Sequence, residues 1–174
     1  MIEGKWFAVY TRPRWEKRVA DLLTKKKIEN YCPVNKIDRP WTDRKKTISE
    51  PLFTSYVFAR LTPQDYVTVM QASGFQSFVY WLGEPAVIRK EEIDAIRLFM
   101  NQYPVVRIEK TQVNHSEEVR IISDPVILRK GNVLEVRNNI VKVVLPSLGH
   151  ALIADMNKEN VENIKYGQPS LLSA

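Results

Sequence analysis

Cysteine and histidine are both nearly absent from this sequence. Cys32 is the only cysteine among 174 residues. A single thiol cannot form an internal disulfide, which excludes a secreted scaffold held by several bridges and a zinc site built from this chain's thiolates alone. The two histidines, His115 and His150, do not have the spacing of a metal site such as His-x-x-x-His. We therefore expect no bound metal and a structural or solvated role for both histidines.

Glycine is also scarce, with six residues that do not cluster. A phosphate-binding loop or a dinucleotide fingerprint needs closely spaced glycines, so neither is predicted. Glu91 and Glu92 are adjacent carboxylates, but they lie at the start of a predicted helix, where negative charge offsets the helix dipole. No convergent set of catalytic groups is visible, and we expect neither an enzyme nor a cofactor.

Long apolar runs are missing as well. No stretch approaches the roughly 18 apolar residues that cross a membrane. Residues 1–5 lead directly into the short run Trp6–Tyr10, which does not have the pattern of a signal peptide. The sequence therefore favours a soluble, cytoplasmic protein without membrane contact, and we expect a monomer.

What the sequence does have is an uneven positive charge. Residues 1–60 hold 14 Lys and Arg against 7 Asp and Glu, whereas the whole chain has a net charge of +6. A localised basic region attracts polyanions such as nucleic acid more strongly than evenly spread charge. Simple solubility is the alternative explanation.

The hydrophobic pattern predicts an α+β first domain over residues 1–103. Strands are predicted over 6–11, 30–39, the second half of 51–61, and 75–81, and helices over 14–27, 62–72 and 90–101. Pro40 is expected to interrupt the second strand, and 41–50 to form a protruding hairpin or loop. The order β-α-β-β-α-β-α indicates helices packed on a mostly antiparallel sheet.

The remainder of the chain predicts a small all-β domain. Residues 104–117 are expected to form a linker, 118–166 an SH3-like barrel, and 167–174 a frayed tail. The expected strands are 119–122, 133–137, 140–145 and 151–154, with Asn138 and Asn139 forming a two-residue turn.

Two groups of residues suggest binding rather than catalysis. Cations gather in and before the first predicted helix, at Arg12, Arg14, Arg18, Lys25 and Lys26. They could contact phosphates, which need flexible cations but no fixed spacing. Aromatic residues gather on neighbouring predicted strands, at Tyr10, Phe53, Tyr56 and Phe58. They could fill the core, or the surplus could form an apolar groove for a partner helix.

Several segments, in order, resemble the NusG-like transcription elongation factors. The supporting segments of the first domain are Lys5–Tyr10, Glu50–Phe58, Gly74–Trp81 and Glu84–Ile93. Residues 119–122, followed by Asp124-Pro125, Gly131 and Val133, resemble a KOW domain. The resemblance implies a NusG-type N-terminal domain and a KOW-type barrel, and it covers residues 5–165.

The resemblance also implies a function and a site. Factors of this kind bind the clamp helices of the largest subunit of RNA polymerase, keep the clamp closed over nucleic acid, and suppress pausing or termination. Tyr10, Phe53, Tyr56 and Phe58 match the polymerase-binding positions, with Glu50 beside them. Arg12 and the basic side of the first helix match the side turned toward the non-template DNA strand. Nascent RNA or a partner of the C-terminal domain would be further ligands.

Some positions depart from the general factor. Asp124 replaces the glycine usual in the KOW turn, and Arg129 stands where an aromatic residue serves contacts with ribosomal protein S10 or Rho. These departures, together with Glu50 and the basic segment before it, make the sequence more similar to the specialised antitermination paralogues than to the general factor. Among these, the UpxY branch of Bacteroidetes, which serves capsule loci, is the one suspected. An RNA-binding or ribosome-associated protein with an SH3-like barrel is the alternative.

Overall fold

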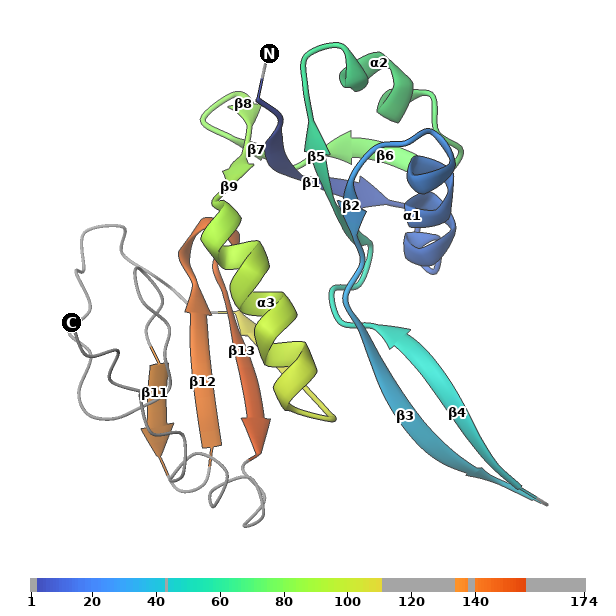
Figure 1. Ribbon diagram of the computed structural model, residues 1–174, viewed down its shortest axis with the longest axis vertical. Helices are drawn as coiled ribbons and strands as arrows, with labels where there is room; N and C mark the ends of the chain where they lie inside the picture. The colour runs from blue at the N-terminus through green and yellow to red at the C-terminus, as the bar shows by residue number, and fades with distance from the viewer. Residues whose placement is uncertain (1–2, 43, 111–133, 138–139, 156–174) are drawn as a thin grey trace, which may run out of the picture.

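The computed structural model describes residues 3–42, 44–110, 134–137 and 140–155 (Figure 1). The first part contains, in order, β1 (Lys5–Thr11), α1 (Glu16–Lys25), β2 (Asn30–Tyr31), β3 (Val34–Trp41), β4 (Arg44–Pro51), β5 (Tyr56–Leu61), α2 (Asp65–Met70), β6 (Phe75–Phe78), β7 (Tyr80–Trp81), β8 (Glu84–Pro85), β9 (Val87–Ile88) and α3 (Lys90–Gln102). The described remainder contains β10 (Arg107–Lys110), β11 (Leu134–Arg137), β12 (Ile140–Leu145), the 3-10 helix η1 (Pro146–Leu148) and β13 (His150–Asp155).

The first part is built on an antiparallel sheet with β1 at its centre. The order is β2-β5-β1-β6, and β9 also pairs with β1. Alternate side chains of β1 point to opposite faces, so Phe7 and Val9 belong to one core cluster and Trp6 and Ala8 to another. The predicted antiparallel sheet with packed helices is thereby confirmed.

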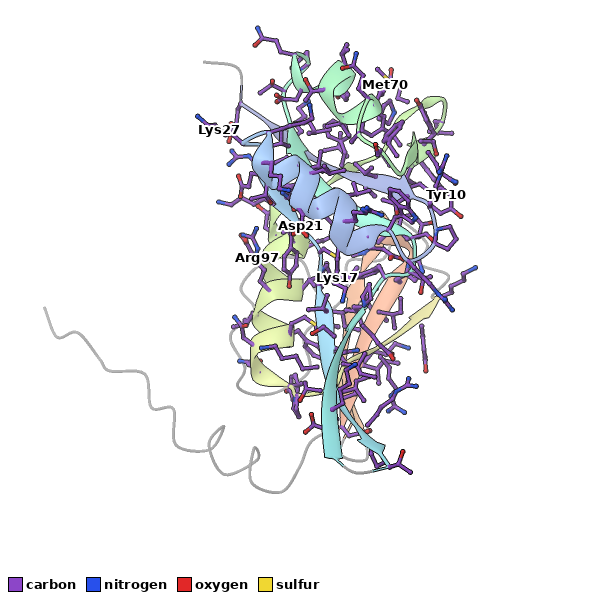
Figure 2. The ribbon with its side chains drawn as sticks, turned by 90° about the vertical axis from the view of Figure 1, so that its right-hand side faces the viewer. Tyr10, Lys17, Asp21, Lys27, Met70 and Arg97 are labelled. Carbon is purple, nitrogen blue, oxygen red and sulfur yellow. The ribbon has the colours of Figure 1, made fainter. Side chains whose placement is uncertain are left out.

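Helices α1 and α2 cover the first face of this sheet. The apolar side chains of α1 recur at helical spacing, which buries Val19 and Leu23 completely, whereas Leu22 is only half-buried. They pack with Val69 of α2 in the cluster that contains Phe7 and Val9. Figure 2 shows α1 across this face, with Lys17 and Asp21 along it, Lys27 just past its C-terminal end and Tyr10 toward its N-terminal end.

The second face of the sheet packs against α3 and the C-terminal strands. Ile93, Ile96 and Phe99 of α3 are buried in the same cluster as Trp6 and Phe58 of the sheet. That cluster continues into β12 and β13 through Val143, Leu145, Leu152 and Ala154. Full burial of each large apolar side chain stabilises the fold by about 1.5–3 kcal/mol, so this shared core is a substantial connection.

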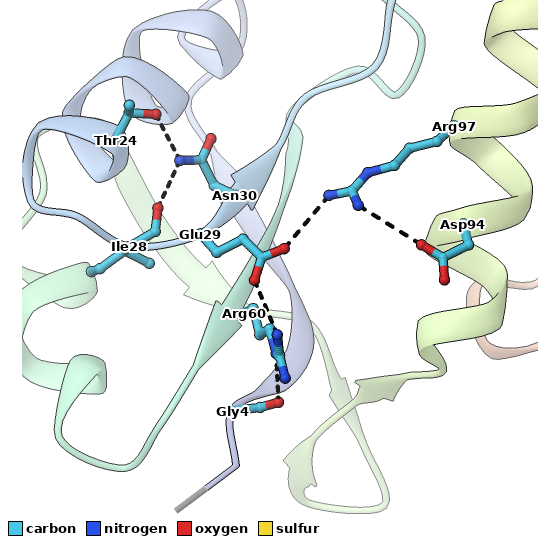
Figure 3. Close-up of polar contacts among 8 residues, drawn as sticks. All are labelled: Gly4, Thr24, Ile28, Glu29, Asn30, Arg60, Asp94 and Arg97. Carbon is cyan, nitrogen blue, oxygen red and sulfur yellow. Dashed lines mark hydrogen bonds and ion pairs between the residues drawn. The ribbon is translucent and has the colours of Figure 1, made fainter.

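A group of charged residues ties α3 to the strands beside it (Figure 3). The Arg97 guanidinium lies 3.8 Å from both Glu29 and Asp94, and Glu29 also pairs with Arg60 at 3.2 Å. Arg97 additionally lies over the rings of Trp6 and Tyr31, at 5.4 and 5.1 Å from their centroids. Since the ion pairs are partly exposed, each contributes little, and the ring contacts orient Arg97.

The described C-terminal strands form a four-stranded antiparallel sheet in the order β10-β13-β12-β11. The strands predicted at 133–137, 140–145 and 151–154 are present as β11, β12 and β13. The range predicted as a linker, 104–117, contains β10, which pairs with β13 from Arg107↔Ile153 to Lys110↔His150. The strand predicted at 119–122, the Asn138-Asn139 turn and the 167–174 tail lie outside the described residues, so closure into a barrel remains a prediction.

Strands β3 and β4 form a separate hairpin that projects from the body of the protein (Figure 1). The prediction that 30–39 forms one strand ended by Pro40 is wrong. The strand is broken at residues 32–33, and Pro40 lies inside β3, opposite Lys45. A two-stranded hairpin has only edge strands, where a proline without an N–H is tolerated.

Candidate functional site

The four predicted aromatic residues gather on the second face of the sheet. Phe58 lies on β5, and its ring meets that of Phe53, from the loop before β5, edge to face with centroids 5.2 Å apart. Tyr10 and Tyr56 are cross-strand partners, with ring centroids 5.3 Å apart. Phe53, Tyr56 and Phe58 line one cavity, and Tyr10 adjoins it through Tyr56. The strand spacing brings these side chains together, and a groove for a partner helix stays a prediction.

The loop that carries Phe53 is held in place by the start of α1. Ser55 adopts the left-handed conformation, with φ of 65°, and its N–H donates to a Glu16 carboxylate oxygen at 2.6 Å. The Ser55 carbonyl accepts from the Thr11 N–H at 2.8 Å. Glu16 and Ser55 are both buried, so this bond fixes the turn between Phe53 and Tyr56.

The C-terminal part closes the cavity from the other side. Ser147 and Leu148 of η1 and His150 of β13 complete the lining of a small space of about 70 Å³. The His150 ring stands edge to face against Phe53, with centroids 6.0 Å apart, and its Nδ1 lies 2.6 Å from the Leu148 carbonyl oxygen. His150 thus has the structural role expected for it, but at an interface.

Burial separates the aromatic residues into two kinds. Phe53 and Phe58 are 3% and 0% exposed beneath the C-terminal part, whereas Tyr10 and Tyr56 are half-buried. Phe58 is therefore a core residue in this arrangement, whereas a partner groove at the half-buried tyrosines stays a prediction. Glu50 lies at the base of the hairpin, where it pairs with Arg39 at 2.7 Å, and does not line the cavity.

Glu92 connects α3 to η1 beside this cavity. One carboxylate oxygen accepts from the Ser147 hydroxyl at 2.8 Å and from the Ser147 N–H at 3.1 Å. The other oxygen is buried and has no hydrogen-bond partner in the described part of the chain. Burial raises the pKa of Glu92 above its usual range, while the Ser147 hydrogen bonds and Arg89 act in the opposite direction. Helix-dipole compensation was the expected role of this residue, and its contact with Ser147 is additional.

The predicted nucleic-acid residues all lie exposed in or beside α1. The side chains are those of Arg12, Arg14, Arg18, Lys25 and Lys26. Arg12 and Arg18 both stack on the ring of Trp15, at 5.8 and 4.6 Å from its centroid. A ten-residue helix is about 15 Å long, so Lys25 and Lys26 form a second group at the far end of α1.

Sequence reasoning missed the contribution of the C-terminal part to the cavity. Ser147, Leu148 and His150 are about 90 residues away from Phe53 and Tyr56 in the chain, and no periodicity connects them. Such a contact depends on how two sheets pack, which a single sequence does not reveal. Among the described residues, no three His, Cys, Asp or Glu side chains are grouped closely enough to hold a metal, and no helix is long and apolar enough to span a membrane.

The two faces differ in chemistry: one has aromatic side chains around an apolar cavity, and the other has two arginines stacked on Trp15. The model of a family described as "Transcription termination factor nusG" matches residues 4–97, more than half of the chain. The chain belongs to the NusG family.

The chain is also similar to individual proteins and to a solved structure. The chain is 26% identical over 165 residues to the "Transcription termination/antitermination protein NusG" of Streptococcus pyogenes serotype M1, and to that of serotype M18, covering 87% of this chain and 91% of each relative. Among solved structures it is similar to "Domain interaction in Thermotoga maritima NusG", with 21% identity, a TM-score of 0.46, and coverage of 88% of this chain and 93% of that one.

Proposed function

We propose that this protein is a transcription elongation and antitermination factor that binds the clamp helices of the largest RNA polymerase subunit. The observation that carries the proposal is the apolar face formed by Phe53, Tyr56 and Phe58, with Tyr10 adjoining it. An amphipathic helix docks by laying its apolar side into such a surface. Binding there would hold the clamp closed and suppress pausing or termination, which is a shift of populations and not a reaction.

The C-terminal part occupies this surface in the described arrangement. Leu148 and His150 lie on the aromatic residues that a clamp helix would contact, and Phe53 is 3% exposed. A helix and the C-terminal part cannot occupy one surface together, so polymerase binding would require the two parts to separate. Because only separated molecules could bind, the measured affinity would be lower than that of the separated form, in proportion to the fraction of molecules that are separated.

Other elements of the proposal follow from the resemblance and from charge. Arg12, Arg14 and Arg18 would face the non-template DNA strand. Nascent RNA, a partner of the C-terminal part, a specialised role and membership of the UpxY branch stay predictions, as do a monomeric state and a cytoplasmic location. Arg129, whose position bears on S10 and Rho contacts, lies outside the described residues.

The decisive experiment measures binding of the full chain to purified polymerase with two variants. Tyr56→Ala removes a half-buried ring of the proposed surface and should weaken binding about tenfold or more. Leu148→Glu places a charge in the apolar contact between the parts, so it should strengthen binding. Tyr80→Ala, which removes an exposed tyrosine from β7, is the control. Phe58→Ala is less informative because truncating this buried ring should cost about 3–5 kcal/mol of stability.

Each outcome discriminates between hypotheses. Competition by a clamp-helix peptide for wild-type binding locates the surface. Binding that is unaffected by Tyr56→Ala, in a protein that remains folded, contradicts the proposed surface. Absence of polymerase binding by wild type and by Leu148→Glu, with salt-sensitive binding to free RNA, would support the RNA-binding alternative.

A further inference from the structure

Glu92 is a buried carboxylate at the contact between the two parts of the chain. It lies in the first turn of α3 and is 1% exposed. Its described side-chain hydrogen bonds both come from Ser147 of η1, which is 55 residues away in the chain. Ser147 also lines the cavity beside Phe53 and Tyr56. Glu92 therefore connects the first part to the segment that covers the aromatic surface.

Helix stability does not require a buried carboxylate at this position. Glu91, its neighbour in the first turn, is exposed and already places negative charge where it offsets the helix dipole. The second oxygen of Glu92 is buried and has no hydrogen-bond partner in the described part of the chain. Burying a charge with one unpaired oxygen is costly, and a glutamine could keep an oxygen for Ser147 without that cost. Such a choice against stability points to a function.

The surroundings of Glu92 differ between two states of the molecule. In the closed arrangement, with η1 and β13 over the cavity, burial raises the pKa of Glu92 above its ordinary 4.5, while the Ser147 hydrogen bonds and Arg89 act in the opposite direction. When the C-terminal part separates, η1 leaves α3 and the carboxylate exchanges Ser147 for water. The closed state then binds a proton more tightly than the open state, so a fall in pH favours closure.

We propose that Glu92 makes separation of the two parts depend on pH: proton uptake holds the C-terminal part on the aromatic surface, and proton release favours its departure. The stabilisation of the closed state is fully present below pH 4.5 and is lost as the pH rises through the raised value. In that interval opening releases one proton, so the ratio of open to closed molecules should rise by at most about tenfold for each pH unit. The consequence for transcription rests on the proposed function, because the uncovered surface is the proposed polymerase-binding surface.

The other charged groups around Glu92 are few in the part of the chain that the structure describes. Arg89 and Glu91, on the same side of the contact, are both exposed. Neither η1 nor β9 contributes a charged residue. His150 of β13 is a further titratable group at the contact, with its Nδ1 2.6 Å from the Leu148 carbonyl oxygen. The experiment must therefore separate the effect of Glu92 from that of His150.

The test follows separation directly, in the full chain and without polymerase, by energy transfer between two pH-insensitive dyes. One dye is attached at Lys27→Cys, just past α1, and the other at Lys110→Cys on β10, which pairs with β13. Cys32→Ser removes the only native thiol. Transfer is measured at pH values from 4.5 upward, and each efficiency is converted to a ratio of open to closed molecules.

Three substitutions in this labelled protein identify the group that takes up the proton. The ratio should rise with pH in the parent protein, and Glu92→Gln should abolish the rise because the amide does not titrate. Glu91→Gln, the matched control, removes an adjacent exposed carboxylate and should keep the rise. Ser147→Ala removes a hydrogen bond that favours the charged form, so its rise should extend to higher pH. A merely structural role of Glu92 would not produce these opposite effects on the pH profile.

The outcomes that would overturn the proposal are distinct. A ratio that does not change with pH in the parent protein would do so. An equal rise in the parent and in Glu92→Gln would assign the dependence to His150, and loss of the rise in both glutamine variants would show that only net charge on α3 matters. Failure of the proposed function is recognised separately, since polymerase binding that is unaffected by Tyr56→Ala contradicts that function and leaves the dye measurement unchanged.

Discussion

At the scale of single residues, Gly74 shows how closely α1 is packed to its neighbours. Its φ is +94°, and a Cβ at this position would lie 2.6 Å from Cε3 of Trp15. The Gly74 carbonyl accepts from the Arg12 N–H at 2.9 Å, which fixes the backbone of Gly74 beside the Trp15 ring. Trp15 in turn supports the two arginines stacked on it. The position needs glycine for conformation and for space.

We predict that Gly74→Ala destabilises the protein by about 2–4 kcal/mol, because strain at positive φ adds to a clash with the Trp15 ring. Gly83→Ala is a matched control, since Gly83 also has positive φ, +84°, but a Cβ there meets nothing within 4 Å. The control should cost about 1 kcal/mol. Urea unfolding of the two variants gives the comparison, and equal losses would show that contact with Trp15 is unimportant.

Glu92 is the residue at which stability and pH should be linked. Its pKa is raised above the ordinary 4.5, chiefly by burial, so the folded protein holds this proton more tightly than the unfolded chain. The free energy of unfolding should therefore fall as pH rises from about 4.5 through the raised pKa. In Glu92→Gln this fall should be absent, because the amide keeps an oxygen for Ser147 but carries no charge. Urea unfolding at several pH values measures both slopes, and parallel slopes would contradict the assignment.

At the scale of elements, strong periodicity was sufficient for some predictions. Alternation and apolar spacing predicted β1, α1, α3, β12 and β13, each of which buries a regular set of side chains. β10 has one half-buried apolar residue, Ile108, and is specified by pairing with β13, so no local pattern marks it. The hairpin strands were misjudged because Pro40 was treated as a strand breaker, whereas edge pairing tolerates it.

Helix α1 provides a prediction about DNA. Arg14→Glu with Arg18→Glu should reduce crosslinking of the protein to the non-template strand of an elongation complex, since both side chains are exposed on the proposed DNA side. Lys5→Glu with Lys110→Glu makes the same change of charge away from α1 and should have a smaller effect. Crosslinking that remains unchanged in the α1 variant would contradict the assignment of this face.

At the scale of the whole molecule, one apolar core joins the first part to the C-terminal strands. Trp6 and Phe58 of the central sheet, α3, and Leu152 of β13 belong to a single cluster. The aromatic members of the candidate site were predictable because they lie close in sequence, at 53–58. Their covering by η1 and β13 was not, because it depends on packing between segments distant in the chain.

The shared core predicts that the two parts unfold together. Leu152→Ala removes a fully buried side chain from β13 and should cost about 2–5 kcal/mol. All four tryptophans lie in the first part, between residues 6 and 81, and Trp6 is a member of the shared core. The urea midpoint measured by tryptophan fluorescence should nevertheless fall. If that midpoint stays unchanged while circular dichroism shows loss of strands, the two parts unfold independently.

The covering of Phe53 by His150 and Leu148 has a consequence for genetics. Under the proposed function, alleles that weaken the contact would lower stability yet raise occupancy of the polymerase, so they would behave as hyperactive and dominant. Alleles that strengthen the contact would give a sturdier protein with a null phenotype. Variants of η1 and the start of β13 that are the most heat-stable should therefore have the lowest activity in a transcription reporter assay, and the least stable should have the highest.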